Sequence, residues 1–216
     1  IIIFVNGGSC YYRNSVDPDG PRYEDHIIEE LLPFVEEQFN AIPSRDGRAI
    51  TGHSMGAMGA AYLGLKYQTL FGAIGCRSGK YDLGLGVVSA EDFPRDVGDW
   101  DTRLATYGQT MDYSTFLANA PVMMAELESP PAIFLDVGIH DESMYPSTLR
   151  FHQKLLELDI PHVYRVTPDG HGWVPYIIEQ IQWSVQVLRR MRSMDELQEL
   201  YPDRFEEYLV PGPTDQ

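Results

Sequence analysis

The fold is decided by the stretch Arg48-Ala49-Ile50-Thr51-Gly52-His53-Ser54-Met55-Gly56. Its first four residues predict a short strand, and the small residues that follow, up to Ala61, predict the start of a helix. A Gly-x-Ser-x-Gly motif between a strand and a helix is typical of a nucleophile elbow, a sharp turn that holds a serine in a strained backbone conformation. We therefore predict that Ser54 is a nucleophile.

The same turn supplies a hydrogen-bond donor beside the serine. The backbone N–H of Met55 belongs to the first turn of the predicted helix, where it can stabilise an oxyanion. Gly52 and Gly56 are expected to leave room for the close approach of strand and helix. The motif alone also fits a turn without chemistry, so the prediction depends on partners elsewhere in the chain.

Apolar runs alternate with helical patterns along the chain. Strands are predicted over residues 1–5, 48–51, 71–76, 132–137 and 162–166. Helices are predicted over residues 23–39, 56–67, 146–158 and 174–191. Pro33 is expected to kink the first helix. The alternation predicts one α/β domain over residues 1–210, with a mostly parallel sheet and helices on both faces, and a frayed tail over residues 211–216.

One connection is longer than the others. Residues 84–129 separate the third and fourth predicted strands, and a segment of that length is often a lid or a substrate-binding cap. Trp100 and Tyr107 lie in it and are candidates for shaping a substrate pocket. The same aromatic side chains also fit a small core of the segment itself.

A nucleophilic serine needs a base and an acid, which follow it along the chain in this kind of fold. His171 is the predicted base, because it lies in a glycine-flanked loop after the last predicted strand. Asp141, in the loop after the preceding strand, is the predicted acid that orients the imidazole, and Glu142 is its nearest competitor. Ser54, Asp141 and His171 would then form a catalytic triad.

Composition limits the other classes of function. Lys and Arg total 16 against 32 Asp and Glu, so the formal charge is −16, which argues against nucleic acid as a partner. No apolar run reaches the roughly 18 residues of a membrane span. Cys10 and Cys76 are expected to be buried free thiols, with a single disulfide as the alternative. A metal site is not expected, because the spacing of the acidic and histidine residues fits no metal motif. No other cofactor is expected, because the proposed serine chemistry needs none.

Several motifs together resemble the esterase D-type family, which includes feruloyl, acetyl-xylan and enterochelin esterases, S-formylglutathione hydrolase and the mycolyltransferases. The resemblance spans residues 2–180 and rests on the motif around Ser54 and on Phe71-Gly72-Ala73, Ser78-Gly79, Gly138-Ile139-His140-Asp141 and Gly170-His171-Gly172-Trp173. It implies an α/β-hydrolase fold. His53 and Trp173, beside the predicted nucleophile and base, are further candidates for substrate contacts.

Two features depart from the family pattern. Ala57 stands where the family usually has glycine, and its methyl group could narrow the space behind the elbow. The family also places further strands before the one predicted at residues 1–5, and one of their loops supplies a second oxyanion N–H. The chain is therefore expected to be a fragment that lacks the N-terminal strands. Alternatively, Asn6-Gly7-Gly8 is itself the oxyanion loop.

Three functional hypotheses follow. The first is a serine carboxylic-ester hydrolase that acts on a small-molecule or carbohydrate ester through an acyl-enzyme. The second is an acyltransferase that uses the same triad. The third is a non-catalytic relative that binds a carbohydrate or a protein partner, which an intact set of Ser54, Asp141 and His171 disfavours.

Overall fold

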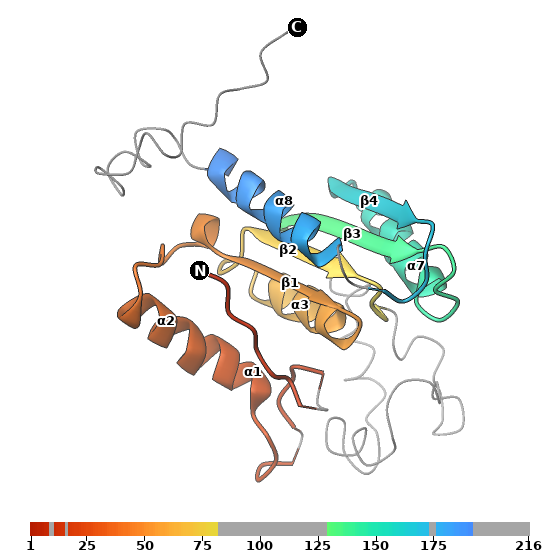
Figure 1. Cartoon of the computed structure of the whole chain (residues 1–216). Coiled ribbons are helices and arrows are strands. Elements are labelled where there is room, and N and C mark those ends of the chain that lie inside the picture. The colour runs from red at the N-terminus through yellow and green to blue at the C-terminus, as the bar shows by residue number, and fades with distance from the viewer. Residues whose placement is uncertain (9–10, 16, 82–128, 173–175, 192–216) are drawn as a thin grey trace, which may run out of the picture.

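The computed structural model of the 216-residue chain describes residues 1–8, 11–15, 17–81, 129–172 and 176–191 (Figure 1). Some of the predictions therefore concern residues outside the described ones. These are the greater part of the expected insertion (84–128), the expected tail (211–216) and the residues Cys10, Trp100, Tyr107 and Trp173.

Four parallel strands form one sheet in the order β1-β2-β3-β4. They are β1 (Ala49–His53), β2 (Ala73–Arg77), β3 (Ala132–Gly138) and β4 (His162–Thr167). All of β2 and nearly all of β3 are buried, as is typical of parallel strands covered on both faces. The predicted parallel sheet is confirmed, and all four strands end at the same edge.

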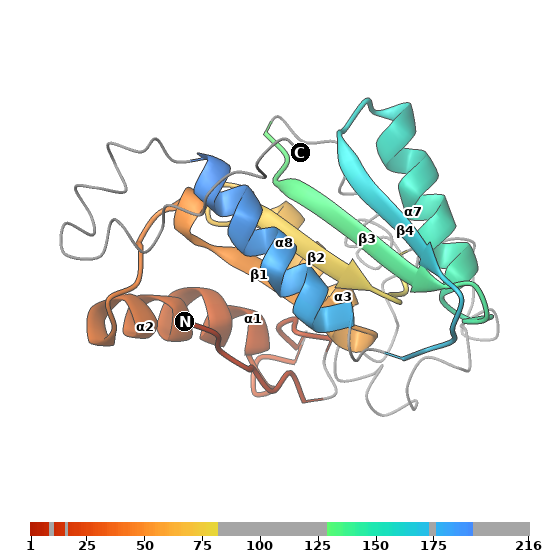
Figure 2. The ribbon, with the colours of Figure 1, turned by 45° about the horizontal axis from the view of Figure 1, so that its top comes forward.

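Helices cover both faces of this sheet, as the sequence predicted (Figure 2). On one face lie α3 (Met55–Lys66) and α7 (Tyr145–Glu157), and on the other lies α8 (Tyr176–Met191). The alternation of side chains along the strands explains the arrangement. Ile74, Cys76, Ile133 and Leu135 pack with the small and aliphatic residues of α3 and with α7 in one core.

The face that carries α8 is less uniformly apolar. Thr51 donates a hydrogen bond to the buried Gln180 of α8 at 3.0 Å, and the rings of Phe134 and Trp183 lie 5.2 Å apart. Gly75 lies beside Thr51 and Gln180. A Cβ on Gly75 would lie 2.7 Å from Thr51 Oγ1 and 3.3 Å from Gln180 Oε1. The missing side chain lets α8 approach the sheet closely, next to the strand ends.

The predicted helix over residues 23–39 is present as three consecutive segments. These are α1 (Tyr23–Asp25), a π-helical stretch η1 (His26–Leu31) and α2 (Leu32–Gln38). Pro33 stands just after the π-helical stretch, in the first turn of α2. Proline lacks an N–H and its ring crowds the carbonyl one turn earlier. The helix therefore passes Pro33 with a widened turn.

A buried carboxylate attaches this helical region to α3. Glu24 is 3% exposed and accepts hydrogen bonds from Tyr62 Oη at 2.9 Å, Tyr67 Oη at 2.6 Å and Lys66 Nζ at 2.5 Å. An ionised buried carboxylate needs such partners. The three donors fix the N-terminal region against the back of the helix that follows the elbow.

The prediction of a strand at residues 1–5 is wrong. Within the described residues this run has no strand partner, and Ile1 and Phe4 are 72% and 81% exposed. Apolar and β-branched composition favours an extended chain, but a strand also needs a neighbour for its N–H and C=O groups. In the part of the chain described, β1 is an edge strand and does not pair with this segment.

Candidate active site

Ser54 lies in the turn between β1 and α3, with φ 56° and ψ −120°. Positive φ is uncommon for a residue other than glycine, and strain of this kind occurs at functional sites. Two backbone hydrogen bonds hold the turn. Ser54 N–H donates to Arg77 O at 2.9 Å, and Ser54 O accepts from Met58 N–H at 3.1 Å. The strand–turn–helix arrangement is the one the sequence predicted.

The two glycines of the motif, Gly52 and Gly56, differ in whether a side chain would fit at their position. A Cβ on Gly52 would overlap the backbone of Gly56, so no side chain fits where strand and helix meet. A Cβ on Gly56 would find Tyr12 Oη at 3.7 Å, an ordinary contact. The expectation that both glycines make room for the elbow is therefore confirmed for Gly52 and wrong for Gly56.

The structure brings Ser54, His171 and Asp141 together in one hydrogen-bonded chain. His171 Nε2 lies 2.9 Å from Ser54 Oγ, and His171 Nδ1 lies 2.7 Å from Asp141 Oδ2. Asp141 is buried at 4% exposure, whereas the His171 side chain is 41% exposed. Asp141, and not the exposed Glu142, is thus the carboxylate in contact with the imidazole.

Hydrogen bonds join the two loops that carry Asp141 and His171. Ile139 N–H donates to Thr167 O at 2.8 Å, and His140 N–H donates to Asp169 O at 2.9 Å. Asp141 Oδ1 also accepts from the backbone N–H of Met144 at 3.3 Å. The carboxylate is therefore held by its own loop while its second oxygen is directed to His171.

His53 lies beside the imidazole of His171, with the ring centroids 4.7 Å apart. Burial lowers the pKa of His53 to about 4, and positive charge on His171 and Arg77 acts in the same direction. His53 is consequently neutral near pH 7. It adds bulk next to the reacting residues without adding a positive charge.

Met55 is the first residue of α3, so its N–H has no acceptor within the helix. This fits the predicted oxyanion donor. The alternative loop, Asn6-Gly7-Gly8, is engaged with itself: Gly8 N–H donates to Asn6 Oδ1 at 2.9 Å, and Gly7 packs against the Tyr12 ring. The N–H of Gly8 is therefore engaged within the loop, and the alternative assignment of Asn6-Gly7-Gly8 as the oxyanion loop stays a prediction.

Sequence reasoning missed Arg77 at the end of β2. Its side chain is fully buried and contacts Asp136 on β3 and Asp169 in the loop of His171. A signal was present, because an arginine at the end of an apolar run needs a buried acidic partner, and Asp136 stands in the middle of the next strand. The register Arg77↔Asp136 shows that the two are direct neighbours in the sheet.

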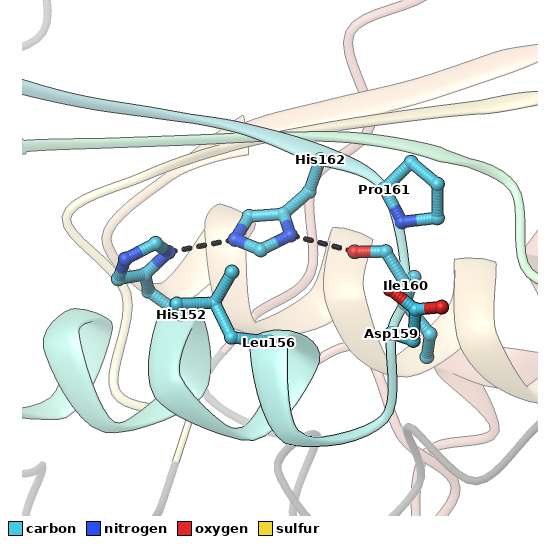
Figure 3. A pocket seen from close by; sticks show the side chains of 6 residues that line it. All are labelled: His152, Leu156, Asp159, Ile160, Pro161 and His162. Atoms are coloured by element: carbon cyan, nitrogen blue, oxygen red, sulfur yellow. Dashed lines mark hydrogen bonds between the residues drawn. The ribbon is translucent and has the colours of Figure 1, made fainter.

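A hollow lies away from the triad, at the C-terminal end of α7 and the start of β4 (Figure 3). It is lined by His152, Leu156, Asp159, Ile160, Pro161 and His162. His152 Nδ1 lies 2.7 Å from His162 Nε2, and His162 Nδ1 lies 2.8 Å from Ile160 O. Because β4 begins here and the triad lies where the strands end, the hollow is at the opposite edge of the sheet.

The described residues also relate to the predictions on a metal site, a membrane span and the cysteines. They contain no group of three or more His, Cys, Asp or Glu side chains placed to hold a metal ion. None of their helices has the length and apolar character needed to cross a membrane. Cys76 is a free, buried thiol that donates a hydrogen bond to Ala57 O at 3.5 Å.

Comparison with known proteins identifies the family. A family described as "Putative esterase" matches residues 5–177. The chain belongs to this esterase family. Among curated proteins it is similar to Esterase Rv1288 of Mycobacterium tuberculosis, with 28% identity over 193 residues that cover 81% of this chain and 42% of that protein. The chain thus spans less than half the length of this relative.

Solved structures show the same fold. A fluorophosphonate-binding serine hydrolase of Staphylococcus aureus, FphF, is similar with a TM-score of 0.67 and 20% identity, over 83% of this chain and 68% of that one. A ferulic acid esterase is similar with a TM-score of 0.60 and 24% identity, over 79% and 63%. The predicted α/β-hydrolase fold is confirmed.

The crowding at the elbow predicts opposite results for its two glycines. Gly52→Ala should lower the free energy of unfolding by about 2 kcal/mol or more, because the methyl group overlaps the Gly56 backbone. Gly56→Ala should change it by less than about 1 kcal/mol, since the methyl group has space and alanine favours a helix. Urea unfolding of both variants measures this, and equal effects would contradict the close approach.

The lowered pKa of His53 predicts a pH-dependent stability. In the unfolded chain this histidine takes up a proton near pH 6.5, whereas in the folded chain it does so only near pH 4. Its contribution to stability is therefore complete above about pH 6.5 and is lost as the pH falls toward about 4. His53→Asn should flatten this part of the pH profile of the unfolding free energy.

Urea unfolding between about pH 7.5 and pH 4 provides the measurement. The unfolding free energy of the variant at pH 7.5 serves as its own reference, because any loss of packing appears there too. Some slope should remain, since burial and the neighbouring His162 also lower the pKa of His152. An unchanged slope in His53→Asn would show that His53 titrates normally in the folded state.

Proposed function

We propose that this chain carries the catalytic centre of a serine carboxylic-ester hydrolase. The observation that supports this most directly is the continuous contact from Asp141 through His171 to Ser54, with distances of 2.7 Å and 2.9 Å. Membership of the esterase family and the serine-hydrolase fold of similar structures point in the same direction.

The geometry suits acyl transfer through a covalent intermediate. His171 Nε2 accepts the hydroxyl proton as Ser54 Oγ attacks the carbonyl carbon of the ester. The Met55 N–H is one donor to the resulting oxyanion. His171 then returns the proton to the departing alcohol, which leaves an acyl group on Ser54. Water, activated by His171, releases the acid and restores the serine.

Asp141 has a separate task in this sequence. Its hydrogen bond keeps the proton of neutral His171 on Nδ1, so Nε2 is free to accept one from Ser54. When His171 becomes positively charged, the buried carboxylate stabilises that charge.

The substrate class proposed is a small-molecule or carbohydrate ester. A similar solved structure is named a ferulic acid esterase, which accords with an aromatic acyl group on a polar alcohol. Transfer of the acyl group to an alcohol instead of water needs the same three residues. The alternatives differ only in the acceptor, so analysis of products with added alcohol distinguishes them.

Removing the nucleophile tests the proposal. The protein should be labelled on Ser54 by a fluorophosphonate probe and should hydrolyse a nitrophenyl acetate. Ser54→Ala should lose the label and lower kcat by a factor on the order of 10³ or more. Ser129→Ala, at an exposed serine, is the control and should behave as the parent protein. Ester hydrolysis that survives Ser54→Ala would refute this mechanism.

Two adjacent acidic residues provide a matched test of the acid. Asp141→Asn should lower kcat by a factor on the order of 10³ to 10⁴, because the amide favours the wrong tautomer of His171. Glu142→Gln removes a neighbouring charge on an exposed side chain and should change kcat less than about threefold. Steady-state kinetics on the same ester compares them, and a larger loss in Glu142→Gln would reverse the assignment.

A further inference from the structure

We propose that Arg77 is a positioning residue that holds the loop of His171 in place relative to Ser54. This inference rests on the function proposed above. It arises from one juxtaposition: a single buried guanidinium contacts the His171 loop on both sides of the histidine, while the backbone of the same residue anchors the nucleophile turn.

The backbone and side chain of Arg77 are both fixed. Its carbonyl oxygen accepts the Ser54 N–H at 2.9 Å. Its side chain is fully buried and forms an ion pair with Asp136, which is also fully buried, on the neighbouring strand β3. The ring of Tyr176, at the start of α8, lies 3.8 Å from the guanidinium carbon. The guanidinium therefore has a defined position close to the elbow.

From this position the guanidinium contacts the loop twice. Its Nη2 lies 2.9 Å from Asp169 Oδ2, two residues before His171. Its Nε donates to the backbone oxygen of Gly172, one residue after His171. Only the planar fork of an arginine can direct separate N–H groups to both acceptors while a third meets Asp136. The segment that carries the base is thus restrained at both ends.

The loop needs such restraint. His171 is exposed, and glycines stand on both sides of it, so the described part of this segment offers little apolar side chain for packing. The bond to Asp141 orients the ring, and His140 N–H binds the Asp169 carbonyl before the histidine at 2.9 Å, whereas Gly172 after the histidine is bound by Arg77. A displacement of about 1 Å at a reacting group costs on the order of 100-fold in rate. Fixing the backbone on either side of His171 keeps Nε2 within reach of Ser54.

A purely structural role would predict that the other arginine bound to Asp136, whose side chain is 30% exposed, matters equally. Arg165 on β4 offers the comparison. It binds the same carboxylate, with its Nε 2.9 Å from Asp136 Oδ2, and it also pairs with Glu179. Within the described residues its contacts lie on β3 and α8, and not on the His171 loop. Arg165→Lys is therefore a matched control.

The experiment compares Arg77→Lys, Asp169→Asn, their double variant and Arg165→Lys in hydrolysis of a nitrophenyl acetate. Lysine keeps the charge opposite Asp136 but cannot span the two loop acceptors. Arg77→Lys and Asp169→Asn should each lower kcat about 10- to 100-fold with KM changed less than about threefold. The double variant should lose little more than the worse single one, because both single variants already remove the contact between Arg77 and Asp169. Arg165→Lys should keep kcat within about threefold.

Several outcomes would overturn the inference. These are an unchanged kcat in Asp169→Asn, multiplicative losses in the double variant, or an equal loss of kcat in Arg165→Lys. If Arg77→Lys does not fold, as judged by circular dichroism, Asp169→Asn decides alone, since its side chain is 32% exposed and the change preserves its size. Ser54→Ala in the same assay separates the two proposals. Activity that survives it refutes the proposed function rather than the role of Arg77.

Discussion

Parallel pairing of β1 to β4 is the constraint on which the rest of the structure depends. Because the strands run in the same direction, the turns after β1, β3 and β4 emerge at one edge of the sheet. Ser54, Asp141 and His171 stand in those turns, and Ser54 meets His171 across a separation of 117 residues. No local feature of the chain brings them together. The hydrogen-bond register of the strands does, and sites in open α/β sheets generally lie at the carboxyl ends of the strands.

The close contact between elbow and helix follows from that sheet and from small residues behind it. α3 must lie near β1 and β2 for the turn at Ser54 to be tight, and Ala57, Ala60 and Ala61 are all buried in the shared core. Ala57, which replaces a glycine of the family pattern, is fully buried there and also accepts a hydrogen bond from Cys76. Its methyl group therefore contributes to core packing at the position where narrowing behind the elbow was expected.

Much of this arrangement could be predicted from the sequence, because each element carries its own pattern. The four strands of the sheet, the candidate residues Ser54, Asp141 and His171, and the family all follow from short motifs and apolar runs. What failed depended on partners that a pattern does not name. The run at residues 1–5 has strand composition but no neighbour among the described residues. The role of Arg77 appears only once strand register places it opposite Asp136.

The ion network around Arg77 is not needed to stabilise the sheet, since buried ion pairs often contribute no more to the free energy of unfolding than apolar side chains of similar size. Its composition fits a different role. Two arginines, Arg77 and Arg165, meet three carboxylates, those of Asp136, Asp169 and Glu179, so each guanidinium has an acidic partner and one carboxylate is in excess. The nearby His53 is neutral because burial lowers its pKa to about 4. The carboxylate in direct contact with the imidazole of His171 is that of Asp141, which lies outside this network. The network can fix the position of the loop that carries His171.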